Sequence, residues 1–250
     1  AARGTVDAAA IARLKKIAIE NDDDTRRLRA AWALHVVEEL DDDSIAGLLK
    51  DSNEYVRSWA IQLALDRPGA TADAWLSRFA DLARSDPSSV VRLCIASALQ
   101  RLPLADRWEI LTALTAHAQD AHDHNLPLMI WYAAEPLAEA DPDRALALGL
   151  ASGRTIPRFR EFMVRRVASI GSQNALAALI DGLAKSTDPD EQLAILDGIR
   201  QALRGQRQVS PTANWPAAYE QAMTSDDQRV RTAAPGLGVT FGDPAAMGAF

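Results

Sequence analysis

The sequence predicts an all-α chain built as a superhelix of about seven helical hairpins. Three observations predict it: a short phrase recurs along the chain, amphipathic segments lie between its copies, and no run has the two-residue period of a strand. Of the 250 residues, 48% are hydrophobic and 24% are charged, which is the balance of an ordinary globular protein and excludes a disordered chain or a rod. We therefore expect a single α-helical solenoid domain over residues 1–250.

The recurring phrase places an aspartate six residues before an arginine, at the start of an apolar helix. It is clearest at Asp51 with Arg57 and at Asp86 with Arg92. Weaker copies keep the apolar pattern and lose one or both charges. With the sixth position of each copy as a marker, at residues 29, 57, 92, 129, 160, 194 and 231, the spacings run from 28 to 37 and average close to 34. This period is typical of a repeated helical hairpin.

An amphipathic segment precedes each marker helix and predicts its partner in the hairpin. Apolar residues recur in these segments at helical spacing. The expected first helices are 8–20, 44–49, 72–84, 107–118, 142–151, 173–184 and 215–223. Proline follows aspartate at several breaks between segments, where the aspartate suits the N-cap and the proline suits the first turn.

The repeated charges predict a ladder that joins one hairpin to the next. Aspartate at a helix N-terminus accepts hydrogen bonds from unpaired backbone N–H groups. The planar fork of an arginine six residues later can reach the equivalent aspartate of the next hairpin. We expect the ladder to consist of Asp23, Arg29, Asp51, Arg57, Asp86 and Arg92.

At these residues the chain resembles the HEAT-repeat family of armadillo-like α-solenoids, whose second helix opens with this aspartate followed by Val-Arg. The resemblance implies a curved scaffold for protein–protein or inter-domain contact, without catalysis. Acidic residues outnumber basic ones, 34 to 27, which argues against a nucleic-acid surface. The absence of an apolar run of about 18 residues predicts that no segment inserts into a membrane.

A narrower resemblance rests on residues 123–137, followed by Ile156-Pro157 and Arg165-Arg166. These residues are similar to the helical region of planctomycete-type secreted proteins, in which a propeller resembling sorbosone dehydrogenases precedes the repeats and a c-type cytochrome domain follows them. The resemblance implies a spacer cut from a larger periplasmic or secreted redox protein, with haem c bound only by a downstream domain. The chain itself has no Cys-x-x-Cys-His motif, and we expect it to hold no cofactor.

Two groups of residues are candidates for contact with a protein partner or a flanking domain. The helix expected over 126–137 is apolar on nearly every side, so that it is either buried in the middle of the stack or faces another domain. A basic run that also includes Arg154 and Arg158 could begin a DNA-binding groove like that of HEAT-like DNA glycosylases, which is the nucleic-acid alternative for this chain. Because the neighbouring hairpins are acidic, the run is better interpreted as a docking point for an acidic protein surface or as a set of inter-repeat pairs. The tentative contact residues are Met129, Trp131, Tyr132, Arg160, Arg165 and Arg166.

Other side chains suggest chemistry but have a simpler interpretation. His117, His122 and His124 lie near two aspartates and could hold Zn or Cu, or could line a ligand groove with Trp131; the simpler interpretation is a solvated loop in which Asp123 caps the next helix. The single cysteine, Cys94, excludes an internal disulfide. Among the tryptophans, we expect those closest after a marker to pack in the core: Trp32, Trp59 and Trp131.

Overall fold

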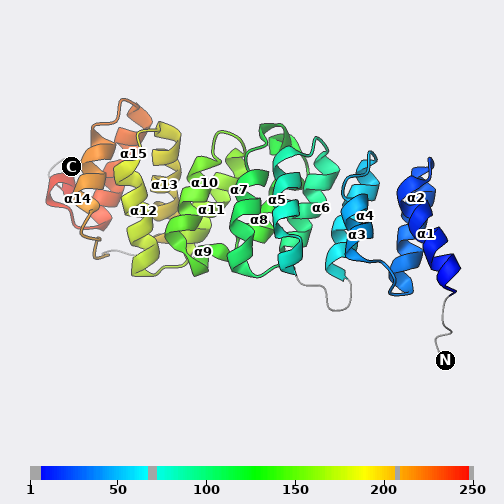
Figure 1. The fold of residues 1–250 in the computed structure, drawn as a ribbon. Coiled ribbons are helices and arrows are strands. Elements are labelled where there is room, and N and C mark those ends of the chain that lie inside the picture. Colours follow the sequence, from blue (N-terminus) through cyan, green and yellow to red (C-terminus); the bar gives the residue numbers. More distant parts are fainter. Residues whose placement is uncertain (1–6, 67–71, 206–208, 248–250) are drawn as a thin grey trace. The chain divides into compact units, whose positions relative to one another are not determined.

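Helices make up all of the regular secondary structure in the computed structural model, which describes residues 7–66, 72–205 and 209–247. No strand occurs within these ranges, so the predicted all-α class is confirmed (Figure 1). None of the described helices is long and apolar enough to cross a membrane. The helices fall into two compact units, Ala1–Leu114 and Thr115–Phe250, which are described separately below.

The first unit contains three helical hairpins and one further helix. Its α-helices are α1 (Ala8–Glu20), α2 (Asp24–Val36), α3 (Asp42–Leu48), α4 (Glu54–Asp66), α5 (Leu76–Ser85), α6 (Ser89–Leu99) and α7 (Arg107–Leu114). Short 3-10 turns lie at Ala72–Ala74 and Leu104–Asp106. The hairpins are α1 with α2, α3 with α4, and α5 with α6. First helices contact first helices (α1 with α3, α5 with α7), and second helices contact second helices (α2 with α4, α4 with α6), so the unit has two layers.

The second unit repeats this arrangement. A 3-10 turn at Ala118–His122 precedes its α-helices, which are α8 (Leu126–Ala134), α9 (Leu137–Ala140), α10 (Pro142–Ala151), α11 (Pro157–Ser169), α12 (Gln173–Lys185), α13 (Pro189–Ala202), α14 (Trp215–Met223), α15 (Gln228–Thr240) and α16 (Pro244–Met247). The hairpins are α10 with α11, α12 with α13, and α14 with α15. One layer holds α10, α12 and α14, and the other holds α8, α11, α13 and α15.

The helix bounds confirm several of the helices predicted from the sequence, whereas the helices expected over 107–118 and 126–137 as one hairpin fall in different units, as α7 and α8. The expected first helices 8–20, 142–151 and 215–223 match α1, α10 and α14 residue for residue. The apolar helix expected over 126–137 is divided, because α8 ends at Ala134 and α9 begins at Leu137, immediately after Pro136. A proline has no N–H to donate to the carbonyl four residues earlier, and its ring crowds that carbonyl, which explains the break.

Side-chain caps at a constant place in the repeat mark the start of α2, α4, α6, α13 and α15, whereas the N-cap residues of α8 and α11 make no such contact. The capping side chains, each accepting a hydrogen bond from a backbone N–H two residues later, are Asp23, Asn53, Ser88, Asp188 and Asp227. Capping of this kind stabilises a helix by about 1 kcal/mol. Between the layers, apolar side chains of both helices are buried, including Trp75, Phe79 and Ile95 in the first unit and Phe159, Ile195 and Trp215 in the second.

Candidate partner-contact surface

Buried ion pairs join neighbouring hairpins of the first unit. The guanidinium of Arg57 on α4 donates from Nε and Nη2 to both carboxylate oxygens of Asp86, at 2.7 and 2.8 Å. Arg27 on α2 makes the same two-pronged contact with Asp51, at 2.6 and 2.8 Å. Their side chains are about one-tenth exposed or less, so solvent screens these pairs weakly. We call each such link between hairpins a rung.

The first rung uses Arg27, and the predicted use of Arg29 was wrong by two residues. We number each copy of the repeat from the residue that lies two places before its capping residue, and we call that residue position 0. The residues at position 0 are Asn21, Asp51, Asp86, Ser186 and Ser225. The side chain at position 6 donates to the backbone carbonyl at position 0 in all five copies, as Arg27, Arg57, Arg92, Gln192 and Arg231. Arg29 is exposed at position 8, and Asp23 at position 2 is the α2 cap.

Neutral side chains make an equivalent rung in the second unit. The Ser225 hydroxyl donates to Oε1 of Gln192 at 3.0 Å, so position 6 of one hairpin again meets position 0 of the next. In the first unit, a second set of hydrogen bonds joins the capping residue of one hairpin to the residue that follows the cap of the preceding hairpin. Asn53 donates to the carboxylate of Asp24, and Ser88 donates to that of Glu54. The Gln192–Ser225 pair shows that a rung can form without charge when both side chains have hydrogen-bonding atoms.

Two tryptophans predicted to lie in the core are on the surface instead. Trp32 on α2 and Trp59 on α4 are 36% and 37% exposed, and their rings meet edge to face with centroids 4.9 Å apart. They occupy positions 11 and 8 of their copies. Tyr55 and Val36 on the same two helices are also exposed, at 57% and 76%. We call Trp32, Val36, Tyr55 and Trp59 the aromatic ridge.

In the second unit, the predicted contact residues on α8 have different surroundings. Trp131 is half-buried and packs edge to face against Phe159 and Phe162 of α11, with centroid distances of 6.5 and 5.5 Å. Tyr132 is 54% exposed, and Met129 is half-buried. Trp131 therefore packs between α8 and α11, as expected for a residue that contributes to the core. Of the three predicted contact residues on α8, Tyr132 is the one that is exposed to a partner.

The arginines of the basic run have two kinds of surroundings. Some make ion pairs within the second unit, and others line a groove. Arg166 donates to Glu135 and Glu139, and Arg154 contacts Asp188 at 3.2 Å. Arg160 and Arg165 line a groove between α11 and α13 with a volume of about 270 Å³. Arg166 on α11 therefore pairs with α9 and with the residue that ends α8, and Arg154 in the α10–α11 loop pairs with the cap of α13. Both are inter-repeat pairs, which was one of the interpretations of this run.

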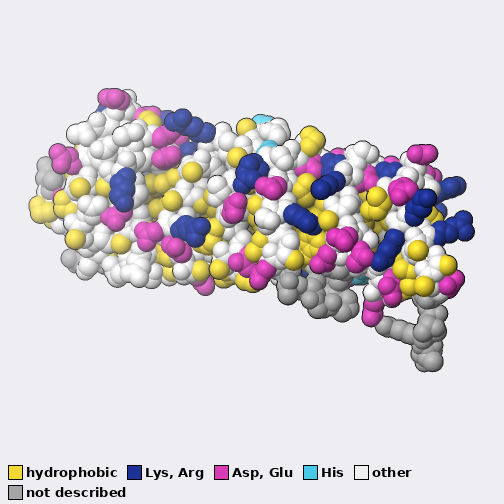
Figure 2. Space-filling view, in the orientation of Figure 1, with side chains coloured by type: hydrophobic (Ala, Val, Ile, Leu, Met, Phe, Trp, Pro, Cys, Tyr) yellow, Lys and Arg dark blue, Asp and Glu magenta, His cyan; other side chains and the backbone are white. Residues whose placement is uncertain are grey.

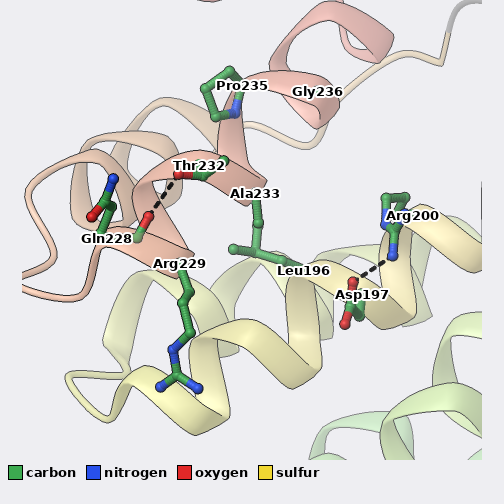
Figure 3. Close-up of a pocket in the computed structure, with 9 residues that line it drawn as sticks. All are labelled: Leu196, Asp197, Arg200, Gln228, Arg229, Thr232, Ala233, Pro235 and Gly236. Atoms are coloured by element: carbon green, nitrogen blue, oxygen red, sulfur yellow. Dashed lines mark hydrogen bonds and ion pairs between the residues drawn. The ribbon is translucent and has the colours of Figure 1, made fainter.

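A second, larger groove lies between α13 and α15, with a volume of about 740 Å³. Figure 3 shows its charged wall on α13, where Arg200 contacts Asp197 at 2.8 Å, and Arg229 reaching from α15 toward α13. Arg229 contacts Asp190 on α13 at 3.3 Å. Pro235 and Gly236 lie at the other end of the lining. Both grooves therefore lie between neighbouring helices of the second-helix layer of this unit.

Charges of both signs are mixed on the face of the molecule drawn in Figure 2, over each of the two units. Such mixing does not favour a track for nucleic-acid phosphates. His122 and His124 are exposed, and a ring nitrogen of His117 contacts Gln119 at 3.0 Å. Within residues 7–66, 72–205 and 209–247, no group of three metal-ligating side chains is placed to hold an ion. The structure therefore does not bring the histidines together as a metal centre.

Among the carboxyl groups at helix starts, Asp41, Asp123, Asp188 and Asp227 have lowered pKa values, and the first two illustrate the causes. Although burial acts to raise the pKa of Asp41, hydrogen bonds from the Lys15 ammonium and the Ser44 N–H outweigh it and lower this pKa to about 2, from a usual 3.8. Backbone N–H groups of Leu126 and Asn125 lower the pKa of Asp123. Asp123 therefore satisfies backbone groups at the start of α8, as predicted. Both carboxylates stabilise the fold while ionised.

Replacing Asp41 with Asn is expected to reduce stability near neutral pH by less than about 1 kcal/mol, because the Lys15–Asp41 pair is about half-exposed. Asparagine retains an oxygen for the Ser44 N–H and loses only the charge. Because the folded-state pKa is lowered, the charge contributes fully above the unfolded value of 3.8 and is lost as pH falls through about 2. Thermal unfolding at pH 2 to 7 should show the two proteins converging at low pH, and a difference that is constant or grows on acidification would contradict this assignment.

No family model matches the chain, and no curated protein matches it.

Proposed function

We propose that this chain is a non-catalytic helical-repeat scaffold whose second-helix layers contact protein partners or flanking domains. The aromatic ridge carries the proposal. Exposed tryptophan and tyrosine side chains are enriched in protein interfaces, where they provide large contact areas with few rotatable bonds. The ridge lies on two successive second helices held together by the Arg27–Asp51 rung, so its geometry is fixed before a partner binds.

The grooves of the second unit support the same proposal, because they also lie on second helices, between α11, α13 and α15. Two expectations from sequence resemblance remain part of the proposal. The finer architecture is a superhelix of about seven hairpins of the HEAT type, and the wider context is a spacer in an exported redox protein. A haem-attachment motif encoded downstream in the same reading frame would support that context, and its absence would remove it.

A photo-crosslinking amino acid at position 55 tests the contact function. Tyr55 is exposed on the ridge, and Ser77 is exposed on α5 in the first-helix layer, where it gives a matched control position. In an extract of the source organism, position 55 should give a discrete cross-linked polypeptide, and position 77 should not. Trp59→Ala should weaken the cross-link from position 55. Equal labelling from both positions, or a position-55 product that Trp59→Ala leaves unchanged, would contradict the proposal.

A further inference from the structure

Arg29 adds an unpaired positive charge to the aromatic ridge. It lies on α2 at position 8, three residues before Trp32, and residues three or four apart share one side of a helix. Arg29 is exposed and makes no hydrogen bond or ion pair with any residue that the structure describes. Its guanidinium is therefore available to a partner that contacts the ridge.

Two contacts between α2 and α4 fix which part of α4 lies beside Arg29. Asn53 donates to the carboxylate of Asp24, and the rings of Trp32 and Trp59 are 4.9 Å apart. Because Arg29 lies between Asp24 and Trp32 along α2, it lies beside the part of α4 between Asn53 and Trp59. The exposed tyrosine of the ridge is in that part. The arginine and the aromatic side chains therefore belong to one surface.

The carboxylates closest to this arginine in the repeat are engaged elsewhere. Asp23 accepts hydrogen bonds from two backbone N–H groups at the start of α2, Asp24 accepts one from the α4 cap, and Glu54 accepts one from the α6 cap. Asp22 lies outside α2, seven residues or about two helical turns before Arg29. The guanidinium thus keeps a positive charge that no neighbouring carboxylate pairs with.

The other end of the ridge is mainly acidic. Glu38 and Glu39 follow the C-cap of α2, and Asp66 at the end of α4 contacts His35 and Arg101. The repeated phosphates of a nucleic acid would meet these acids, whereas a single carboxylate at the Arg29 end of the ridge would not. Charge complementarity therefore favours an acidic residue of a polypeptide as the group that pairs with Arg29.

We propose that the aromatic ridge binds a polypeptide segment in which an acidic residue lies next to large apolar side chains. The carboxylate pairs with Arg29, and the apolar side chains pack on Trp32 and Trp59. The chain joins its own hairpins with the same kind of pair, as at Arg57 and Asp86. Apolar contact beside the pair excludes water and so strengthens it. This inference rests on the proposed contact function and specifies the chemistry of the partner.

Selection of ligands from random dodecapeptides displayed on phage, with the full chain immobilised, tests the inference. Ligands that bind the ridge are identified by their loss of binding to Trp59→Ala. These ligands should contain Asp or Glu beside Leu, Ile, Phe or Trp more often than the starting library does.

Fluorescence anisotropy with end-blocked, labelled copies of the enriched peptides then measures the charge contribution. Arg29→Gln should fold normally, because Arg29 is exposed, and should weaken binding about twofold to fivefold, as expected for an exposed ion pair. The effect should shrink as salt is added. Replacing the acidic residue of the peptide with its amide should weaken binding equally, and the two changes together should not add. Arg13→Gln is the matched control, since Arg13 is exposed on α1 in the first-helix layer, and should leave binding unchanged.

Ridge-dependent ligands without acidic enrichment, or with affinities that Arg29→Gln does not change, would overturn the inference and leave the proposed function intact. Equal weakening by Arg29→Gln and Arg13→Gln would also overturn it, because the effect would then reflect overall charge. A selection that yields no ligand sensitive to Trp59→Ala would overturn it as well. The cross-link from position 55 tests the proposed function independently, so the two failures are distinguishable.

Discussion

Replacement of Asp86 with Ala is expected to destabilise the first unit by about 3–5 kcal/mol, the usual cost of removing one partner of a buried ion pair. The Arg57 guanidinium would stay largely buried without the carboxylate that accepts two of its hydrogen bonds. Asp86 also accepts a hydrogen bond from the Ser88 N–H, at the start of α6. Asp86→Ala therefore removes both the link between the second and third hairpins and a backbone contact at the start of α6.

Urea unfolding followed by circular dichroism measures this effect, with Asp66→Ala as the matched control. Asp66 is 60% exposed and pairs with His35 and Arg101. Exposed pairs contribute about 0–1 kcal/mol, so the control should unfold close to wild type. Equal losses in the two variants would show that burial of the Arg57–Asp86 pair has no special effect on stability.

Replacement of Phe159 with Ala is expected to destabilise the second unit by about 3–5 kcal/mol, because a fully buried phenyl ring would leave a cavity. The ring lies between α11 and Trp131 of α8. Its removal should also loosen α8, and hydrogen exchange of the α8 amides should become faster.

Phe162→Ala provides the comparison for this second prediction. Phe162 contacts the same Trp131 ring but is only half-buried. A smaller loss is expected, because part of the phenyl surface is already in contact with water. A loss for Phe162→Ala as large as that for Phe159→Ala would indicate that contact with Trp131, and not burial, determines the stability of this region.

Sequence periodicity predicted several helices to the residue, such as α1, α10 and α14, because these segments carry an apolar stripe between clear breaks. It did not predict that the segment 72–84 contains a 3-10 turn before α5, or that α7 ends at Leu114. It failed at the register of the first copy, where Asp22, Asp23 and Asp24 allow several alignments. Aligning the capping residues would have identified Arg27, since the cap precedes the rung residue by four positions in every copy. The Gln192–Ser225 rung was missed because neither residue is charged.

The exposed position of Trp32 and Trp59 could not be predicted from hydrophobicity alone. Large aromatic side chains favour burial on average, and a position near the marker suggested the core. Which side of a second helix faces the first layer depends on how the two layers pack, and the repeat pattern does not contain that information.

Rungs connect the proposed function to the fold. A surface made from successive second helices keeps its shape only if each hairpin is held at a fixed offset from its neighbour. Apolar packing between helices permits small sliding motions, whereas a bidentate arginine–carboxylate contact favours a single geometry. Charged rungs in the first unit therefore suit the aromatic ridge, which spans two hairpins.

A double-mutant cycle on Arg57 and Asp86 tests most directly whether hairpins of this chain are joined by rungs. The cycle uses Arg57→Met, Asp86→Ala and the double variant, with unfolding free energies measured in urea. A coupling free energy of about 2 kcal/mol or more is predicted, because each single variant leaves a buried partner unsatisfied and the double variant does not. A coupling below about 0.5 kcal/mol would mean that the two residues act independently, and hairpin-to-hairpin linkage by these side chains would be contradicted.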